Sequence, residues 1–582
     1  MNKLNNIKKV IIVLLSYLFV KLLFLLFSLI SNSIYIVIIT SIISFCVYYF
    51  LKERKEKKDI VVISVFSLLL SLTLTIQNKI SFNGNISSSF QEMTISKFQW
   101  VDGIKVAILG VCLFFFIFYV CEKNKKSKFS IVNSEKSFSK KNSFLYWLAF
   151  SVAIAIPFLF FLCTYAPGSI LADSLNSLSQ GLGWIPYSNH QPVVYSVIVG
   201  LFMRIGGTFN SYTTGVMLYS IFQTLIISGI LGYFLLWMKK QGIKETYIIL
   251  CYLYFIANTL FACYAITMWK DPLFCAFIFL LTLYLYDIIK SRGEILKTPK
   301  GITKFIILDF LIAFFRNNGI YILIGVGIAL IFCYRKKILK FQIINMITIL
   351  CIIIIQGPIY SMLKIDTPME ESLAIPIQQI ARTVAYDGEM TKSQREFINT
   401  ILPIEKWKED YKPGLVDTIK WDDEINLKYI GENKLEFVKL WFSLMPKNMK
   451  HYIDAYLLDT YGFWSIETKN DYGFYSIGVI ENKVGINNKD IIKTATGKSL
   501  KSIYKNPDFC GSGTLLWIML TSIMLLIIQR KQIYIIVLTP CILSILSILI
   551  ATPVAFSLRY VFMLAYCLPV FILLPYMTKN EE

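Results

Sequence analysis

Residues 533–552 read IYIIVLTPCILSILSILIAT, a run of 20 residues without one charged side chain. About 20 apolar residues are enough for a helix to cross the hydrocarbon core of a bilayer. Similar runs recur along almost the whole chain, and one long polar stretch, residues 364–511, interrupts them. This pattern predicts an all-α polytopic membrane protein.

The apolar runs are numerous enough to fill most of the 582 residues, 56% of which are hydrophobic. Such a composition lies far outside the range of soluble proteins. We predict about fourteen transmembrane helices, at residues 10–30, 33–51, 60–77, 104–121, 144–166, 212–238, 246–265, 272–289, 303–316, 319–334, 341–363, 513–529, 533–552 and 560–577.

The net charge of +21 is distributed unevenly along the chain. Residues 364–511 carry 22 acidic and 20 basic side chains, a net charge of −2, whereas the remainder carries +23, mainly in short loops between apolar runs. Basic short loops mark the cytoplasmic face of a membrane protein, so the charge does not indicate a nucleic-acid partner. We therefore predict a multi-pass protein of a bacterial plasma membrane with both termini in the cytoplasm.

The same topology divides the chain into five parts. Residues 1–121 form an N-terminal module of four spans, and residues 122–143 form a basic cytoplasmic linker. Residues 144–363 form a membrane core with an extracytoplasmic loop at 167–211. Residues 364–511 form a helical extracytoplasmic cap without a large core of its own, and residues 512–582 form the last three spans.

Two shorter segments are predicted outside the spans. Residues 192–207, PVVYSVIVGLFMRIGG, are apolar, but a crossing here would place every later basic loop outside, so we expect an interfacial helix. In the cap, Thr391 is expected to cap a helix that runs to Leu402.

Several chemistries are excluded by missing signatures. The chain has no P-loop, no dinucleotide-binding glycine pattern and no HExxH motif. Its 12 cysteines lie mostly within apolar runs and lack metal-ligand spacing, so we expect buried thiols. A site that works outside the cell without a nucleotide needs a substrate that is already activated there.

The first candidate site residues lie in the loop at 167–211. Asp173 sits just above hydrocarbon, where a carboxylate can act as a general base or as a metal ligand, and a helix N-cap is the alternative. His190 can titrate or bind a phosphate, and its alternative role is a structural hydrogen bond before Pro192.

Further candidates share the same predicted face of the membrane. Lys270 and Asp271 separate two spans, where they can bind a lipid phosphate or form an interfacial ion pair with an N-cap. Arg316 and Asn317 lie at a helix break, and Arg559 begins the last span. Either arginine can clamp a phosphate with two hydrogen bonds or extend to lipid headgroups.

In the cap, an amphipathic segment at 370–385 carries Gln379 and Arg382. These side chains can hydrogen-bond a sugar, and solvation at the surface is an equally good interpretation.

Taken together, these residues resemble those of the GT-C membrane glycosyltransferases, and more specifically a group of bacterial GT-C-like multipass proteins. The resemblance covers residues 144–577. It rests on Asp173 and on the segments YSNH (187–190), KDP (270–272), RNNG (316–319), IPIQQIAR (375–382) and RY (559–560). It departs from the family at Asp173, which has no adjacent acid, and at Gln191-Pro192, where many members have two prolines.

The resemblance implies a GT-C fold and a hexosyl- or pentosyltransferase that takes its sugar from a polyprenyl-phosphate donor. The acceptor would be a glycan, a teichoic acid or a protein of the cell envelope. Asp173 would be the base or the ligand of a divalent Mg or Mn ion, and Lys270, Arg316 and Arg559 would hold the donor phosphate. The alternatives are a transporter or flippase of a lipid-linked glycan and a non-catalytic membrane protein.

Overall fold

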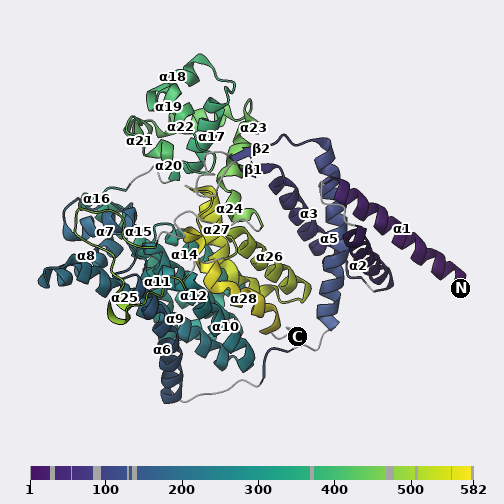
Figure 1. Ribbon diagram of the computed structural model, residues 1–582, viewed down its shortest axis with the longest axis horizontal. Helices are drawn as coiled ribbons and strands as arrows, with labels where there is room; N and C mark the ends of the chain where they lie inside the picture. The colour runs from purple at the N-terminus through teal and green to yellow at the C-terminus, as the bar shows by residue number, and fades with distance from the viewer. Residues whose placement is uncertain are drawn as a thin grey trace.

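A computed structural model describes residues 2–26, 33–53, 55–82, 93–126, 130–133, 140–367, 372–466, 477–504, 509–551 and 554–577. Apart from one two-stranded ribbon, the secondary structure of these residues is helical, which confirms the prediction of an all-α chain. In Figure 1 the N-terminal helices stand on one side, the membrane core on the other, and the C-terminal helices lie between them, with the cap at one end.

The N-terminal module is a set of long apolar helices with a short β-ribbon at one end. Its elements are α1 (Asn2–Leu26), α2 (Ser33–Lys52), α3 (Lys57–Gln77), β1 (Ile80–Phe82), β2 (Met93–Ile95) and α5 (Trp100–Lys126). The two strands pair antiparallel, with Ser81 opposite Thr94. Part of the predicted linker lies outside the described residues.

The membrane core follows the linker. It contains α6 (Lys140–Thr164), α7 (Ala172–Leu182), α8 (Val193–Thr208), α9 (Tyr212–Lys240), α10 (Glu245–Ala257), α11 (Thr259–Ile266), α12 (Lys270–Lys290), η1 (Glu294–Lys297), α13 (Pro299–Phe315), α14 (Gly319–Tyr334), η2 (Arg335–Ile338), α15 (Leu339–Ile354), η3 (Ile355–Ile359) and α16 (Tyr360–Met362). Helix α12 is its centre, because nearly all of its side chains are buried.

The cap consists of short helices. They are α17 (Ala374–Ala385), α18 (Lys392–Ile401), α19 (Ile404–Asp410), α20 (Asp417–Lys420), α21 (Leu427–Glu432), α22 (Lys434–Leu444), α23 (Met449–Asp459), α24 (Tyr461–Trp464) and α25 (Ile491–Thr496). Thr391 accepts a hydrogen bond from the backbone N–H of Gln394, which confirms the predicted helix cap. The cap does have its own hydrophobic core, which includes the fully buried Trp407, so our expectation of a thin core was wrong.

The C-terminal segment joins all the other parts. It contains α26 (Ser512–Ile528), η5 (Gln532–Leu538), α27 (Thr539–Ile550), η6 (Leu558–Val561) and α28 (Met563–Met577). Helix α26 packs on α3 through Ile63, Met524 and Ile528. Between α27 and η6 the chain passes under the cap, where Ala555 donates to the carbonyl of Gly414 and accepts from the N–H of Gly462. This passage places η6 directly below the cap.

The described residues of the fourteen predicted spans are almost all helical, and residues 27–30 and 552 of these spans lie outside the described part of the chain. The number of spans that cross a membrane is not confirmed. Among the described residues, eight helices are long and apolar enough to cross a membrane, or nine if the bent pair α10 and α11 is one span. Helices α26 and α28 have only 17 and 15 residues, and α13 carries Lys304 and Asp309. Residues 319–362 are one of these eight segments, although the helix is interrupted after α14, where Arg335 has a positive φ of 44°.

The predicted interfacial helix is α8, which has 16 residues and packs on α7 and α9. Glycines make both contacts close. A Cβ at Gly181 would lie 2.4 Å from the carbonyl oxygen of Ser196, and a Cβ at Gly206 would lie 2.5 Å from the backbone nitrogen of Gly215. Because these backbones nearly touch, α8 and α9 fix the position of α7.

The orientation of the chain can be tested by cysteine labelling. In a background in which the exposed Cys333 and Cys351 are serine, we expect a membrane-impermeant maleimide to label Thr496→Cys in intact cells. Lys340→Cys should be labelled only after the cells are permeabilised, because the basic loops are predicted to face the cytoplasm. The opposite pattern would contradict the predicted topology.

Candidate functional site

The candidate site begins with Asp173, which lies in the first turn of α7. The helix starts here because the hydroxyl of Ser174 accepts a hydrogen bond from the backbone N–H of Leu171 (3.1 Å). The N-terminal end of a helix carries partial positive charge, which stabilises a carboxylate in its first turn.

The second acid, Asp271, occupies the equivalent position in the first turn of α12. Arg316 follows the last residue of α13, at the negative end of that helix dipole. The break predicted at Arg316 is therefore real, and three helix ends meet with charges that suit their dipoles.

Arg559 connects the two acids. Its Nη2 donates to Oδ2 of Asp173, and its Nε lies 2.7 Å from Oδ2 of Asp271. The other oxygen of Asp271 lies 3.0 Å from Nη1 of Arg316. The result is a continuous chain of ion pairs, Asp173–Arg559–Asp271–Arg316, between residues up to 386 positions apart. We refer to these four residues as the charge chain.

Burial differs along the charge chain. The side chain of Asp271 is fully buried, those of Arg316 and Arg559 are 10% and 13% exposed, and that of Asp173 is 29% exposed. Burial raises the pKa of the Asp173 carboxyl, but the charges of Arg559 and Lys270 outweigh burial and hold the pKa below its usual range. Asp173 is therefore an ionised carboxylate and the most accessible member of the chain.

Aromatic rings hold both guanidinium groups in place. Arg559 lies over the ring of Trp269, 4.3 Å from its centroid, and Arg316 lies 4.9 Å from the centroid of Tyr560. Arg316 also donates to the backbone carbonyl of Tyr560 (3.1 Å). Cation–π contacts of this kind are stronger when they are shielded from water.

Lys270 extends this site toward the loop before α8. Its Nζ donates to the backbone carbonyl of His190 (3.0 Å) and to Oε1 of Gln191 (2.9 Å), so both contacts are with neutral oxygens. Asn317 donates to the backbone carbonyl of Asn189 (2.6 Å). The ring centroids of His190 and of Trp421, which belongs to the cap, lie 5.7 Å apart. The loop, the core and the cap thus meet at one place.

The site has a surplus of positive charge and unused polar atoms. Three cations, Lys270, Arg316 and Arg559, stand against two acids. Among the described residues, four buried polar atoms beside them have no hydrogen-bond partner: Nε2 of Gln191, Nε1 of Trp269, Oδ1 of Asn317 and Oγ of Ser557. Buried polar atoms are nearly always satisfied by protein, water or ligand. This arrangement suits an anion that also accepts and donates hydrogen bonds.

The same geometry does not suit a resident divalent ion. No group of three or more His, Cys, Asp or Glu side chains that could hold a metal occurs in the described part of the chain. Asp173 and Asp271 both contact the guanidinium of Arg559, which occupies the space between them. These donors do not fit a bound Mg or Mn ion, and we assign no step to one.

Two predicted site residues lie elsewhere. Gln379 and Arg382 are buried inside the cap. Gln379 donates a hydrogen bond to the backbone carbonyl of Tyr452 and accepts one from the indole N–H of Trp441. Arg382 forms an ion pair with Asp454 at 3.3 Å. The predicted contact of these two residues with a sugar has no support, because their polar atoms serve the cap core. Sequence reasoning also overlooked Trp269 and Tyr560 as supports for the arginines, although each lies next to a predicted residue.

The fold and the site define an α-helical protein with several helices that can span a membrane and a buried charge chain under a cap of short helices. Residues 186–582 match the model of DUF6020, a family of unknown function, and the protein belongs to this family. The matched region contains His190, Lys270 and both arginines of the charge chain, whereas Asp173 precedes it. No curated protein and no solved structure matches the chain.

Proposed function

We propose that this protein is a GT-C-type membrane glycosyltransferase. It moves a sugar from a polyprenyl-phosphate donor to an acceptor of the cell envelope, which is a glycan, a teichoic acid or a protein. The reaction takes place on the extracytoplasmic face of the plasma membrane, where the charge rule puts the cap. The single observation that carries the proposal is the meeting of Asp173 with three cations at one site.

Asp173 is the proposed general base. It is the most exposed member of the charge chain, so an acceptor hydroxyl can reach it. As the acceptor oxygen bonds to the anomeric carbon of the sugar, the bond from that carbon to the donor phosphate breaks. The hydroxyl proton passes to Asp173, and the polyprenyl phosphate leaves with the bonding electrons.

The cations stabilise the departing phosphate. Lys270 is the best placed, because its ammonium group contacts only neutral oxygens and can accept an anionic partner without breaking an ion pair. Arg559 offers a guanidinium already oriented by Trp269. Donors that are fixed before the reaction stabilise developing charge more effectively than mobile ones.

The ion pair with Arg559 sets the basicity of Asp173. In the free protein the carboxylate is a weak base, because Arg559 and Lys270 hold its pKa low. A donor phosphate that pairs with these cations weakens their hold and raises the proton affinity of Asp173. The pKa of Asp173 therefore rises only when the donor is bound, and the carboxylate stays ionised in the free protein.

Transport of a lipid-linked glycan is the second candidate function. One observation favours it: Asp309 is fully buried in α13, and neither carboxylate oxygen has a hydrogen-bond partner among the described residues. Ionisable groups inside membrane segments often belong to transport pathways.

Deletion of the gene separates the two functions. Mass spectrometry of envelope glycans and lipid-linked sugars should show one missing glycosyl decoration together with accumulated polyprenyl-phosphate sugar. A complete lipid-linked glycan trapped on the cytoplasmic leaflet would instead indicate transport. An unchanged glycan profile would refute the transferase proposal.

A further inference from the structure

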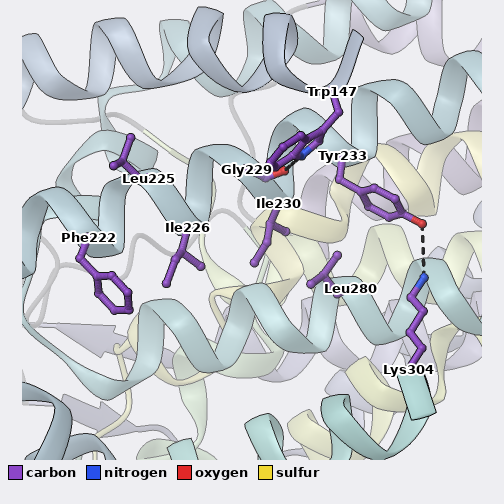
Figure 2. Close-up of a pocket in the computed structure, with 9 residues that line it drawn as sticks. All are labelled: Trp147, Phe222, Leu225, Ile226, Gly229, Ile230, Tyr233, Leu280 and Lys304. Carbon is purple, nitrogen blue, oxygen red and sulfur yellow. Dashed lines mark hydrogen bonds between the residues drawn. The ribbon is translucent and has the colours of Figure 1, made fainter. Parts of the chain in front are cut away.

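A second site lies on the lateral surface of the membrane core. It is a cavity of about 560 Å³ lined by residues of α6, α9, α12 and α13: Trp147, Phe222, Leu225, Ile226, Gly229, Ile230, Tyr233, Leu280 and Lys304 (Figure 2). We call it the lateral groove. Leu225 on its wall is 51% exposed, so the groove opens outward between spanning helices. A surface of this kind faces lipid when the helices cross a membrane.

One end of the groove is positively charged and the other is apolar. Figure 2 shows Phe222 and Lys304 at opposite ends. The ammonium group of Lys304 lies 4.2 Å from the ring centroid of Tyr284 and 3.4 Å from the hydroxyl of Tyr233. The carboxylate of Asp287 acts on Lys304 but lies beyond ion-pair distance, where Trp237 and Gln241 donate hydrogen bonds to it. The positive charges of Lys300 and Lys240 act on the same end and outnumber this single acid. This end therefore has room for an anion.

The dimensions match one leaflet of a bilayer. The groove follows α9 from Phe222 to Tyr233, about 16 Å at 1.5 Å per residue. Half of a hydrocarbon core is about 15 Å. Lys304 lies near the start of α13, whereas Arg316 of the charge chain follows its end, so the two sites are at opposite ends of this helix. The groove is thus separate from the proposed transferase site and does not depend on it.

We propose that the lateral groove binds one anionic phospholipid of the cytoplasmic leaflet, with an acyl chain along α9 and the phosphate on Lys304. The sequence favours this leaflet because Lys240, Lys290 and Lys300 all belong to basic loops predicted to be cytoplasmic. Trp147 forms a fixed wall, since its indole N–H donates to the carbonyl of Gly229 (2.9 Å). A preformed wall and a charge at one end suit an amphipathic anion.

Native mass spectrometry of the full-length protein, titrated with dioleoyl phosphatidylglycerol or dioleoyl phosphatidylcholine, tests this inference. Phosphatidylglycerol should bind more tightly, and Lys304→Gln should weaken it about fivefold without changing phosphatidylcholine binding. Lys58→Gln, at an exposed position of α3 in the N-terminal module, is the matched charge control and should leave the binding of both lipids unchanged.

Gly229→Leu tests the apolar part. A Cβ at Gly229 would lie 3.6 Å from Trp147, an ordinary contact, so leucine fills the groove without a clash at its Cβ. Gly229→Leu should weaken the binding of both lipids, whereas Ile249→Phe, at a 56% exposed position of α10, should weaken the binding of neither. The inference is overturned if both groove variants bind phosphatidylglycerol like the wild type, if the two phospholipids bind equally, or if undecaprenyl phosphate displaces phosphatidylglycerol from the groove.

Discussion

Asp173→Asn is expected to reduce sugar transfer by about 100- to 10,000-fold, the range that a general base contributes. Asparagine keeps the size of the side chain but cannot accept the acceptor proton. Arg559 retains its ion pair with Asp271 in this variant, so the protein should still fold. The measurement compares the rate of glycan decoration in a deletion strain complemented with wild type or variant at equal protein level.

Asp387→Asn is the matched control. This aspartate lies on the cap surface with a side chain that is 80% exposed, and its replacement should leave transfer unchanged. Wild-type activity in the Asp173→Asn strain would remove Asp173 from the reaction. Loss of activity in both strains would indicate a general effect of charge rather than a base at one site.

Arg559→Met is expected to lower the free energy of unfolding by about 3–5 kcal/mol, the effect of removing one partner from a buried ion pair. The change leaves Asp173 without its closest cation and Asp271 with only Arg316 as an ion-pair partner. The measurement is thermal or denaturant unfolding of the detergent-purified protein. Arg395→Met, on an exposed position of α18, should change stability by less than about 0.5 kcal/mol.

A rescue and a pH series distinguish electrostatics from lost packing. Adding Asp173→Asn to Arg559→Met should recover much of the lost stability, because the carboxylate that lost its ion-pair partner is removed while Asp271 keeps its pair with Arg316. In the wild type the pKa of Asp173 lies below its unfolded value of about 3.9, so its contribution is present above that pH and lost only as the pH falls through the lower folded value. Without Arg559, fewer positive charges counteract the effect of burial, so the pKa of Asp173 rises. The difference in unfolding free energy between Arg559→Met and the wild type should therefore narrow as the pH falls toward 4. A deficit that is independent of pH and is not rescued would contradict the ion-pair explanation.

The sequence predicts the helices well because the bilayer imposes a simple rule. An apolar run must form a helix to satisfy its backbone, and the described part of each predicted span is almost entirely helical. The number of crossings is harder to predict. Runs such as 513–529 are apolar throughout yet form a helix of 17 residues, near the lower limit for a span.

The core of the candidate site can also be predicted from the sequence, since few charged residues lie at the predicted outer ends of the apolar runs. The sequence predicts Asp173, Lys270, Arg316 and Arg559 as site residues on that ground, and the structure brings them together. Their pairing was not predictable, because it depends on how α7, α12, α13 and η6 pack.

Gln379 and Arg382 illustrate the opposite case. Their helix, α17, has an amphipathic sequence, but the cap packs around nearly all of it, so polar residues that suggest a surface became internal hydrogen-bond partners. Sequence periodicity gives the apolar face of a helix and cannot show that a polar face is buried as well.

Sugar transfer by the purified protein is the decisive measurement. The protein would be reconstituted in nanodiscs with lipid-linked sugars and acceptor extracted from the deletion strain, so the sugar need not be known in advance. Release of polyprenyl phosphate and the mass gain of the acceptor would be followed by mass spectrometry. We predict time-dependent release with the wild type and almost none with Asp173→Asn. Equal release by both proteins, or none by the wild type from an extract that contains the accumulated donor, would contradict a transferase centred on the charge chain.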